Sequence, residues 1–128
     1  MDVVVPLSRK LLMKYIYFPW EDDIKPYSEY STEEYSIFDG FFKEIVRCAR
    51  EMLNECKVAD KTHAAAAVAL TIKTILQVDY YIEGPILRDA LEYVPGATTK
   101  DLCQAEFHLF RSSGFLPCNS SPFVRIDS

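Results

Sequence analysis

The chain has 128 residues, of which 49% are hydrophobic and 13% aromatic, a composition that fits one folded domain and excludes a disordered chain. Its formal net charge of −5 at pH 7 argues against nucleic-acid binding, because a nucleic-acid surface needs an excess of Lys and Arg. Neither a secretory signal peptide nor an apolar run long enough to cross a bilayer is visible. We therefore expect an intracellular protein, cytoplasmic or nuclear, that does not bind membranes.

The first element in chain order is a short helix within the N-terminal region, residues 1–37. Apolar residues recur at helical spacing over Ser8–Phe18, and the proline that follows would stop a helix. Ser8 is the expected capping residue, since serine hydroxyls accept hydrogen bonds from the free amides of a first turn.

A long loop is predicted next, over Pro19–Tyr35, because the segment has two prolines and no sustained period. Between residues 21 and 34 it carries six acidic residues against one lysine. Two interpretations stay open for this charge: a solvated loop, or an acidic patch that faces a basic partner. We expect Trp20 and Tyr27 to hold the loop on the body of the protein and to supply binding hot spots.

Two longer helices carry the clearest patterns. Phe38–Cys56 repeats apolar residues at alternating spacings of four and three, a single stripe whose start Ser36 or Asp39 would cap. His63–Gln77 is apolar on nearly all sides, and a helix without a polar face must be buried all round. We therefore expect this alanine-rich segment, capped by Asp60, to be the central helix of the domain.

Two further helices are predicted at Pro85–Val94 and Thr98–Ser112, the second opening with Thr98 and Asp101 in a capping-box arrangement. The last helix is expected to bury Phe110, and Cys103 is expected in apolar surroundings. The sequence thus predicts a single all-α domain over residues 1–128, a compact five-helix bundle around a buried central helix, with its core at residues 38–125.

The residues that carry chemistry in enzymes are sparse. His63 and His108 are the only histidines, and neither has a cysteine or carboxylate at metal-ligand spacing. No phosphate-binding or hydrolase motif is present. The last two helices resemble a helix-turn-helix, but Asp101 and Glu106 make the second one a poor DNA-reading helix. We expect no enzyme, cofactor, metal site or nucleic-acid partner.

The helix order and several local motifs resemble a cyclin box. Ala49-Arg50-Glu51-Met52-Leu53 stands where that family has its second-helix signature, and Lys73 follows the alanine-rich run at nearly the family's interval. Glu106 is followed by apolar residues, as in the family's fifth helix, and then by Gly114-Phe115-Leu116 and Pro122-Phe123-Val124.

The resemblance implies a non-catalytic regulatory module that binds a protein kinase of the cyclin-dependent type. In cyclins the lysine and glutamate contact the backbone of the kinase's regulatory helix, so Lys73 and Glu106 are the expected partner-binding residues, together with Arg50 of the signature stretch. The alternative is a helical adaptor or inhibitor that holds a non-kinase partner in an apolar groove, as Bcl-2-like proteins do. The aromatic run Tyr15–Trp20 weakly resembles the first helix of some of those proteins.

Overall fold

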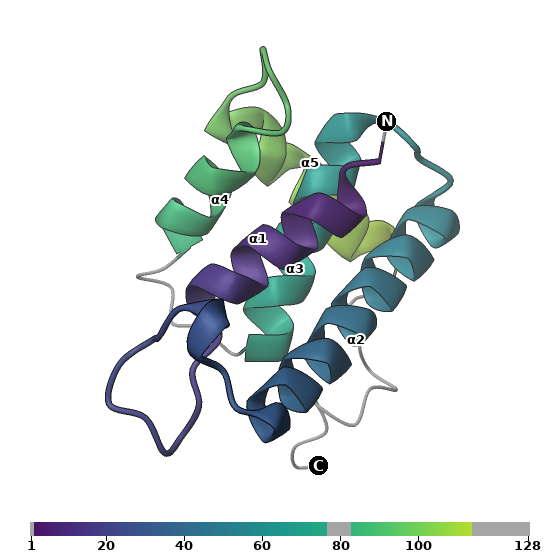
Figure 1. Cartoon of the computed structure of the whole chain (residues 1–128). Helices are drawn as coiled ribbons and strands as arrows, with labels where there is room; N and C mark the ends of the chain where they lie inside the picture. The colour runs from purple at the N-terminus through teal and green to yellow at the C-terminus, as the bar shows by residue number, and fades with distance from the viewer. Residues whose placement is uncertain (1, 77–82, 114–128) are drawn as a thin grey trace.

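The computed structural model describes residues 2–76 and 83–113, and within these ranges the chain is helical with no strand. The predicted all-α class is therefore confirmed. In chain order the elements are α1 (Val4–Tyr15), a 3-10 turn η1 (Tyr27–Glu29), α2 (Thr32–Cys56), α3 (Lys61–Leu76), α4 (Glu83–Leu91) and α5 (Thr99–Ser113) (Figure 1). The Gly114-Phe115-Leu116 and Pro122-Phe123-Val124 motifs lie outside the described residues.

The first helix begins earlier than predicted. The N-cap position is Val3, and the Asp2 carboxylate just before it accepts a hydrogen bond from the amide of Val4 at 3.1 Å, so Asp2 and not Ser8 satisfies an amide of the first turn. Ser8 instead lies inside α1 and is fully buried. The helix ends at Tyr15, after which the backbone is extended. The predicted start at Ser8 is therefore too late. Val4 and Leu7 precede it, and both are buried as part of the apolar face of α1.

The second helix also starts before its predicted cap. Ser31 and Glu34 form a capping box, in which the Ser31 hydroxyl accepts from the Glu34 amide at 3.2 Å and the Glu34 carboxylate accepts from the Ser31 amide at 2.9 Å. Ser36 and Asp39 therefore lie within α2, not at its start. The caps predicted for the later helices are present, since Asp60 accepts from the His63 amide and Thr98 pairs with Asp101.

Packing converges on α3. This helix contacts α1, α2, α4 and α5, and in Figure 1 it lies behind α1 and α2 with α5 on its far side. All six residues of Ala64–Ala69 are buried, and Ala66 and Val68 have no exposed surface. Alanine side chains are short, so the neighbouring helices approach the α3 backbone closely and bury it on several sides at once.

Candidate functional site

A nearly buried ion pair joins α3 to α5. The Lys73 ammonium lies 3.0 Å from Glu106 Oε1 and 2.9 Å from Oε2. The side chain of Lys73 is 16% exposed and that of Glu106 is 10% exposed. The pair forms because α3 and α5 pack against each other and bring the two side chains to the edge of their contact. The structure thus brings together the two residues to which the cyclin resemblance pointed.

Apolar side chains surround this pair on the outer flank of α5. A pocket of about 420 Å³ is lined by the pair together with Leu70, Cys103, Phe107 and Phe110. We call the last four residues the α5 patch. Phe107 is 62% exposed and Phe110 is 48% exposed, although both are large and apolar. An exposed apolar cluster beside a charged pair is typical of a surface that binds another protein.

The expectation that α5 buries Phe110 is therefore wrong, while Cys103 lies among apolar side chains as expected but is exposed. Phe110 and Cys103 face outward, while Leu102 and Leu109 fill the inner face. Successive residues of a helix are about 100° apart, and positions 103, 107 and 110 fall on one flank, beside the face that packs on α3. The Arg111 guanidinium lies 5.4 Å from the Phe107 ring centre and adds a positive charge to the edge of the patch.

Arg50 does not join the α5 patch. It is exposed on α2, 3.6 Å from the Asp2 carboxylate, and lines a separate pocket with Lys61 at the start of α3. Lys73 lies twelve residues further along that helix, roughly 18 Å away at 1.5 Å per residue. The two predicted partner-binding positions therefore belong to different surfaces.

Trp20 and Tyr27 form a third group, at the acidic loop. The Trp20 indole nitrogen donates to Glu34 Oε2 at 2.6 Å, and its ring stacks on Phe18 with centroids 5.5 Å apart. Tyr27 packs edge-on against Tyr30 in a ring cluster that continues into α2. The expectation that these aromatics hold the loop on the body agrees with these contacts.

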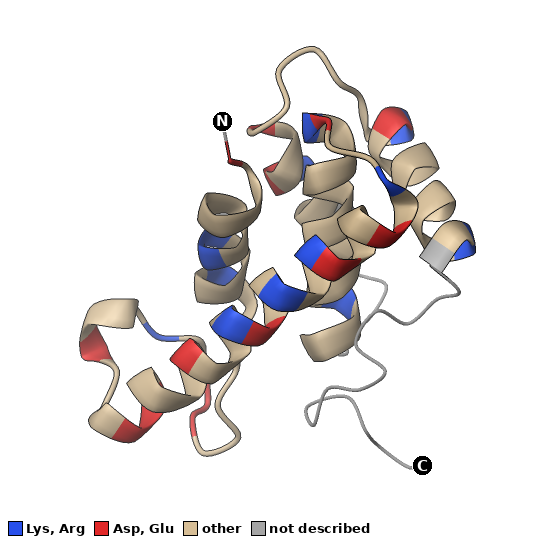
Figure 2. Ribbon diagram, turned by 90° about the vertical axis from the view of Figure 1, so that its right-hand side faces the viewer, with Lys and Arg blue, Asp and Glu red and all other residues tan. Residues whose placement is uncertain are grey.

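The acidic segment 21–34, whose last residues belong to α2 and not to the predicted loop, is not uniformly solvated, because Glu34 is 1% exposed. Its carboxylate lies 2.7 Å from the Lys25 ammonium. The hydrogen bonds from Lys25, from the Ser31 amide and from Trp20 lower the pKa of Glu34 to about 2. Four acids of the segment remain exposed: Asp22, Asp23, Glu29 and Glu33. Figure 2 shows several acidic positions gathered at one end of the molecule.

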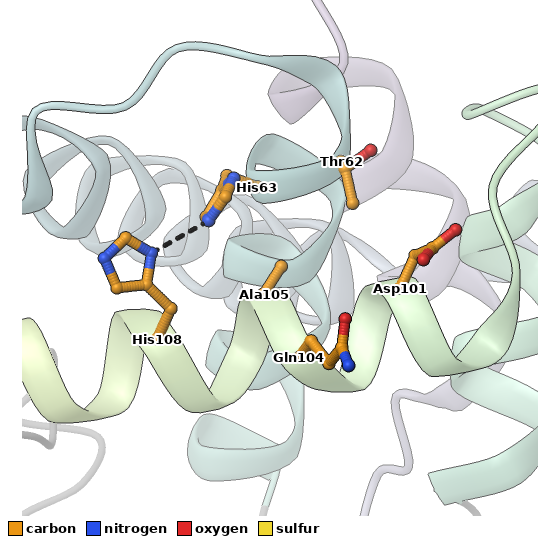
Figure 3. Close-up of a pocket in the computed structure, with 6 residues that line it drawn as sticks. All are labelled: Thr62, His63, Asp101, Gln104, Ala105 and His108. Atoms are coloured by element: carbon orange, nitrogen blue, oxygen red, sulfur yellow. Dashed lines mark hydrogen bonds between the residues drawn. The ribbon is translucent and has the colours of Figure 1, made fainter.

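The structure also brings together the two histidines, which the linear sequence keeps 45 residues apart. His63 Nε2 faces His108 Nδ1 at 3.0 Å across the gap between α3 and α5 (Figure 3). Asp60 lies against the other nitrogen of His63, with its Oδ1 2.8 Å from Nδ1. No spacing rule on one segment reveals this arrangement, because it depends on how α5 packs on α3.

Compared with protein-family models, with curated proteins and with solved structures, the chain shows no significant match. Its resemblance to cyclin boxes therefore depends on the residues quoted above. None of the helices within residues 2–76 and 83–113 has the length and apolar character needed to cross a membrane. The proposed function therefore depends on the geometry of the site.

Proposed function

We propose that this chain is a non-catalytic protein-binding module whose docking surface is the Lys73–Glu106 pair and the α5 patch around it, and that its partner is a protein kinase of the cyclin-dependent type. The observation that carries the proposal is the nearly buried ion pair that opens onto two exposed phenylalanines. A surface of this kind combines anchors for affinity with fixed charges for orientation.

The charged pair fits the end of a helix or a loop in the partner. An ammonium donates to the free carbonyls at a helix C-terminus, and a carboxylate accepts from the free amides at an N-terminus. Both groups of the pair are held in place by packing, so little side-chain freedom is lost when a partner binds. The pair therefore selects for backbone geometry rather than for a particular side chain.

The two phenylalanines supply the apolar contact. Phe107 and Phe110 lie on the same flank as Cys103, with Leu70 of α3 completing the floor of the pocket. Aromatic residues of this exposure dominate many interfaces because they bury a large area with few rotatable bonds. We expect one apolar side chain of the partner to enter between them.

Two features support the kinase assignment: the order of the helices, and the two helices from which Lys73 and Glu106 come. Cyclins use a lysine late in the third helix and a glutamate in the fifth, and in this chain Lys73 of α3 pairs with Glu106 of α5. The packing of α3 against four other helices is also the arrangement expected for a cyclin box. In this proposal the module holds one conformation of the kinase by binding it preferentially.

One observation favours the alternative, a helical adaptor for a non-kinase partner. The pocket beside the pair is lined by more apolar than polar side chains, with Leu70, Cys103, Phe107 and Phe110 against Lys73 and Glu106. Such a surface also accepts the apolar face of an amphipathic helix. The two candidates differ in the identity of the partner, so a covalent capture experiment separates them.

The test places a photo-crosslinking amino acid at Phe107, with a control at Tyr17, which is also an exposed aromatic but lies outside the α5 patch. Purified cyclin-dependent-type kinases are irradiated with each protein, and the linked peptides are identified by mass spectrometry. We expect crosslinks from position 107 to the kinase's regulatory helix and none from position 17. The kinase assignment fails if no kinase binds, and crosslinks from position 107 to an amphipathic helix of another protein establish the adaptor.

A binding measurement with variants complements the capture. We expect Phe107→Ala to weaken kinase binding about 30-fold, the effect of losing a hot spot worth about 2 kcal/mol. The matched control removes an exposed ion pair on α2 with Lys43→Met and Asp39→Leu, and should leave affinity unchanged. An equal loss of kinase affinity in Phe107→Ala and in the control variant would contradict the proposed docking surface.

A further inference from the structure

The histidine pair between α3 and α5 has a geometry that the docking function does not use. His63 comes from the first turn of α3 and His108 from the third turn of α5, and these are the only histidines of the chain. Their rings are nearly perpendicular, with an interplanar angle of 81° and centroids 5.1 Å apart. Figure 3 shows the two rings pointing toward each other at one end of a surface pocket.

Asp60 fixes the state of the first histidine. Its carboxylate oxygens lie 2.8 Å and 3.0 Å from His63 Nδ1, and one of them also accepts from the His63 amide. In the neutral imidazole, a carboxylate at this distance accepts a hydrogen bond from Nδ1, which leaves the lone pair on Nε2. A histidine oriented by a carboxylate in this way is the usual form of a metal-binding imidazole.

The distance between the facing nitrogens matches a shared cation. Imidazole nitrogens bind divalent transition metals at about 2.0–2.1 Å, so two such ligands at a right angle lie about 2.8–3.0 Å apart, and two at a tetrahedral angle about 3.3–3.4 Å apart. His63 Nε2 and His108 Nδ1 are separated by 3.0 Å, within this range. With the ring centroids 5.1 Å apart, the two nitrogens point almost directly at each other. An ion would therefore replace this hydrogen bond: the proton between the nitrogens would move to the other nitrogen of His108 or be released, and both rings would turn toward one side.

The surroundings leave room for the rest of a coordination shell. The pocket has a volume of about 430 Å³ and is also lined by Thr62, Asp101, Gln104 and Ala105. Among the described residues, no third His, Cys, Asp or Glu completes a ligand cluster, and Asp101 lies in the first turn of α5, at the opposite end of the pocket. The remaining positions around an ion would be filled by water.

From this geometry we propose that His63 and His108 bind one divalent first-row transition metal ion of the kind that prefers imidazole, such as Ni²⁺ or Zn²⁺, with Asp60 orienting His63. Binding would link the first turn of α3 to α5 through a bridge that both helices share. The proposal is independent of the docking function, because the pocket has no residue in common with the α5 patch.

The test uses the untagged protein under reducing conditions and titrates Ni²⁺ or Zn²⁺ alone by calorimetry, with NMR detection of the imidazole resonances. We expect one ion per chain and shifts of both imidazoles. His108→Ala should weaken binding at least tenfold, and Asp60→Asn roughly 10- to 100-fold, the usual effect of losing a carboxylate behind a metal-binding histidine. Asparagine is an equally good helix cap, so α3 should keep its start.

Gln104→Ala is the matched control, since it lines the same pocket without an imidazole and should leave metal affinity unchanged. Circular dichroism of each variant checks that helicity is preserved. The proposal is overturned if the wild type binds neither ion, which would leave a hydrogen bond between two neutral imidazoles. It is also overturned if His108→Ala binds as tightly as the wild type, which would assign the metal to cysteine thiols.

Discussion

The contribution of the Lys73–Glu106 pair to the free energy of unfolding can be tested quantitatively. Lys73→Met keeps most of the side-chain volume and leaves the Glu106 carboxylate, 10% exposed, without its ammonium. Breaking a fully buried pair costs about 3–5 kcal/mol, and the residual exposure of this pair reduces our expectation to about 2–4 kcal/mol of unfolding free energy. Replacing both partners, with Lys73→Met and Glu106→Leu, should bring stability back to within about 1 kcal/mol of the wild type, because no buried charge remains.

The assay is urea unfolding followed by circular dichroism. With a slope of about 2 kcal/mol per molar urea, Lys73→Met should move the midpoint down by about 1–2 M. The control is Lys43→Met on α2, whose partner Asp39 lies at 3.0 Å but where the side chains are 76% and 58% exposed; we expect a change of at most about 0.5 kcal/mol. The reasoning is refuted if Lys73→Met costs no more than Lys43→Met, or if the double variant is less stable than the single one. A stable double variant also separates binding from folding, since it should still fold while losing its kinase affinity.

Three further predictions concern the fold around the site. The pKa of Glu34 is about 2 in the folded protein and 4.5 ordinarily, so this carboxylate should stabilise the fold fully above pH 4.5 and lose that contribution as the pH falls toward 2. Unfolding followed by Trp20 fluorescence should show that the stability of Glu34→Gln depends less on pH in this range than that of the wild type. Ala67→Leu, at a fully buried position of α3, should lower stability by about 1–3 kcal/mol through overpacking, and an unchanged melting temperature would contradict close packing there. Ser31→Ala should cost about 1 kcal/mol by removing the cap of α2, whereas Ser36→Ala, at the exposed position first predicted as the cap, should change the urea midpoint little.

Local patterns were sufficient to predict the helices themselves. The stripe from Phe38 to Cys56 and the apolar run of Ala64–Ala69 required helices because only a 3.6-residue period gathers such residues on one face or buries them on all sides. Helix starts were harder to place. Ser31 and Ser36 are chemically identical, and the Glu34 carboxylate three residues after Ser31 completes the cap that the structure uses. The pattern S-x-x-E was visible in the sequence and marks the start that was missed.

The sequence by itself determined that the chain is a set of amphipathic helices with a buried alanine-rich member, because that information lies within a few helical turns. Only the tertiary structure decided which polar groups meet. Lys73 reaches Glu106, and His63 reaches His108, across the packed faces of α3 and α5. It also decided that Phe110 faces outward while Glu34 is buried. These outcomes depend on the rotation of each helix against its neighbours, which is set by side-chain packing between distant segments and leaves no periodic signal in either one.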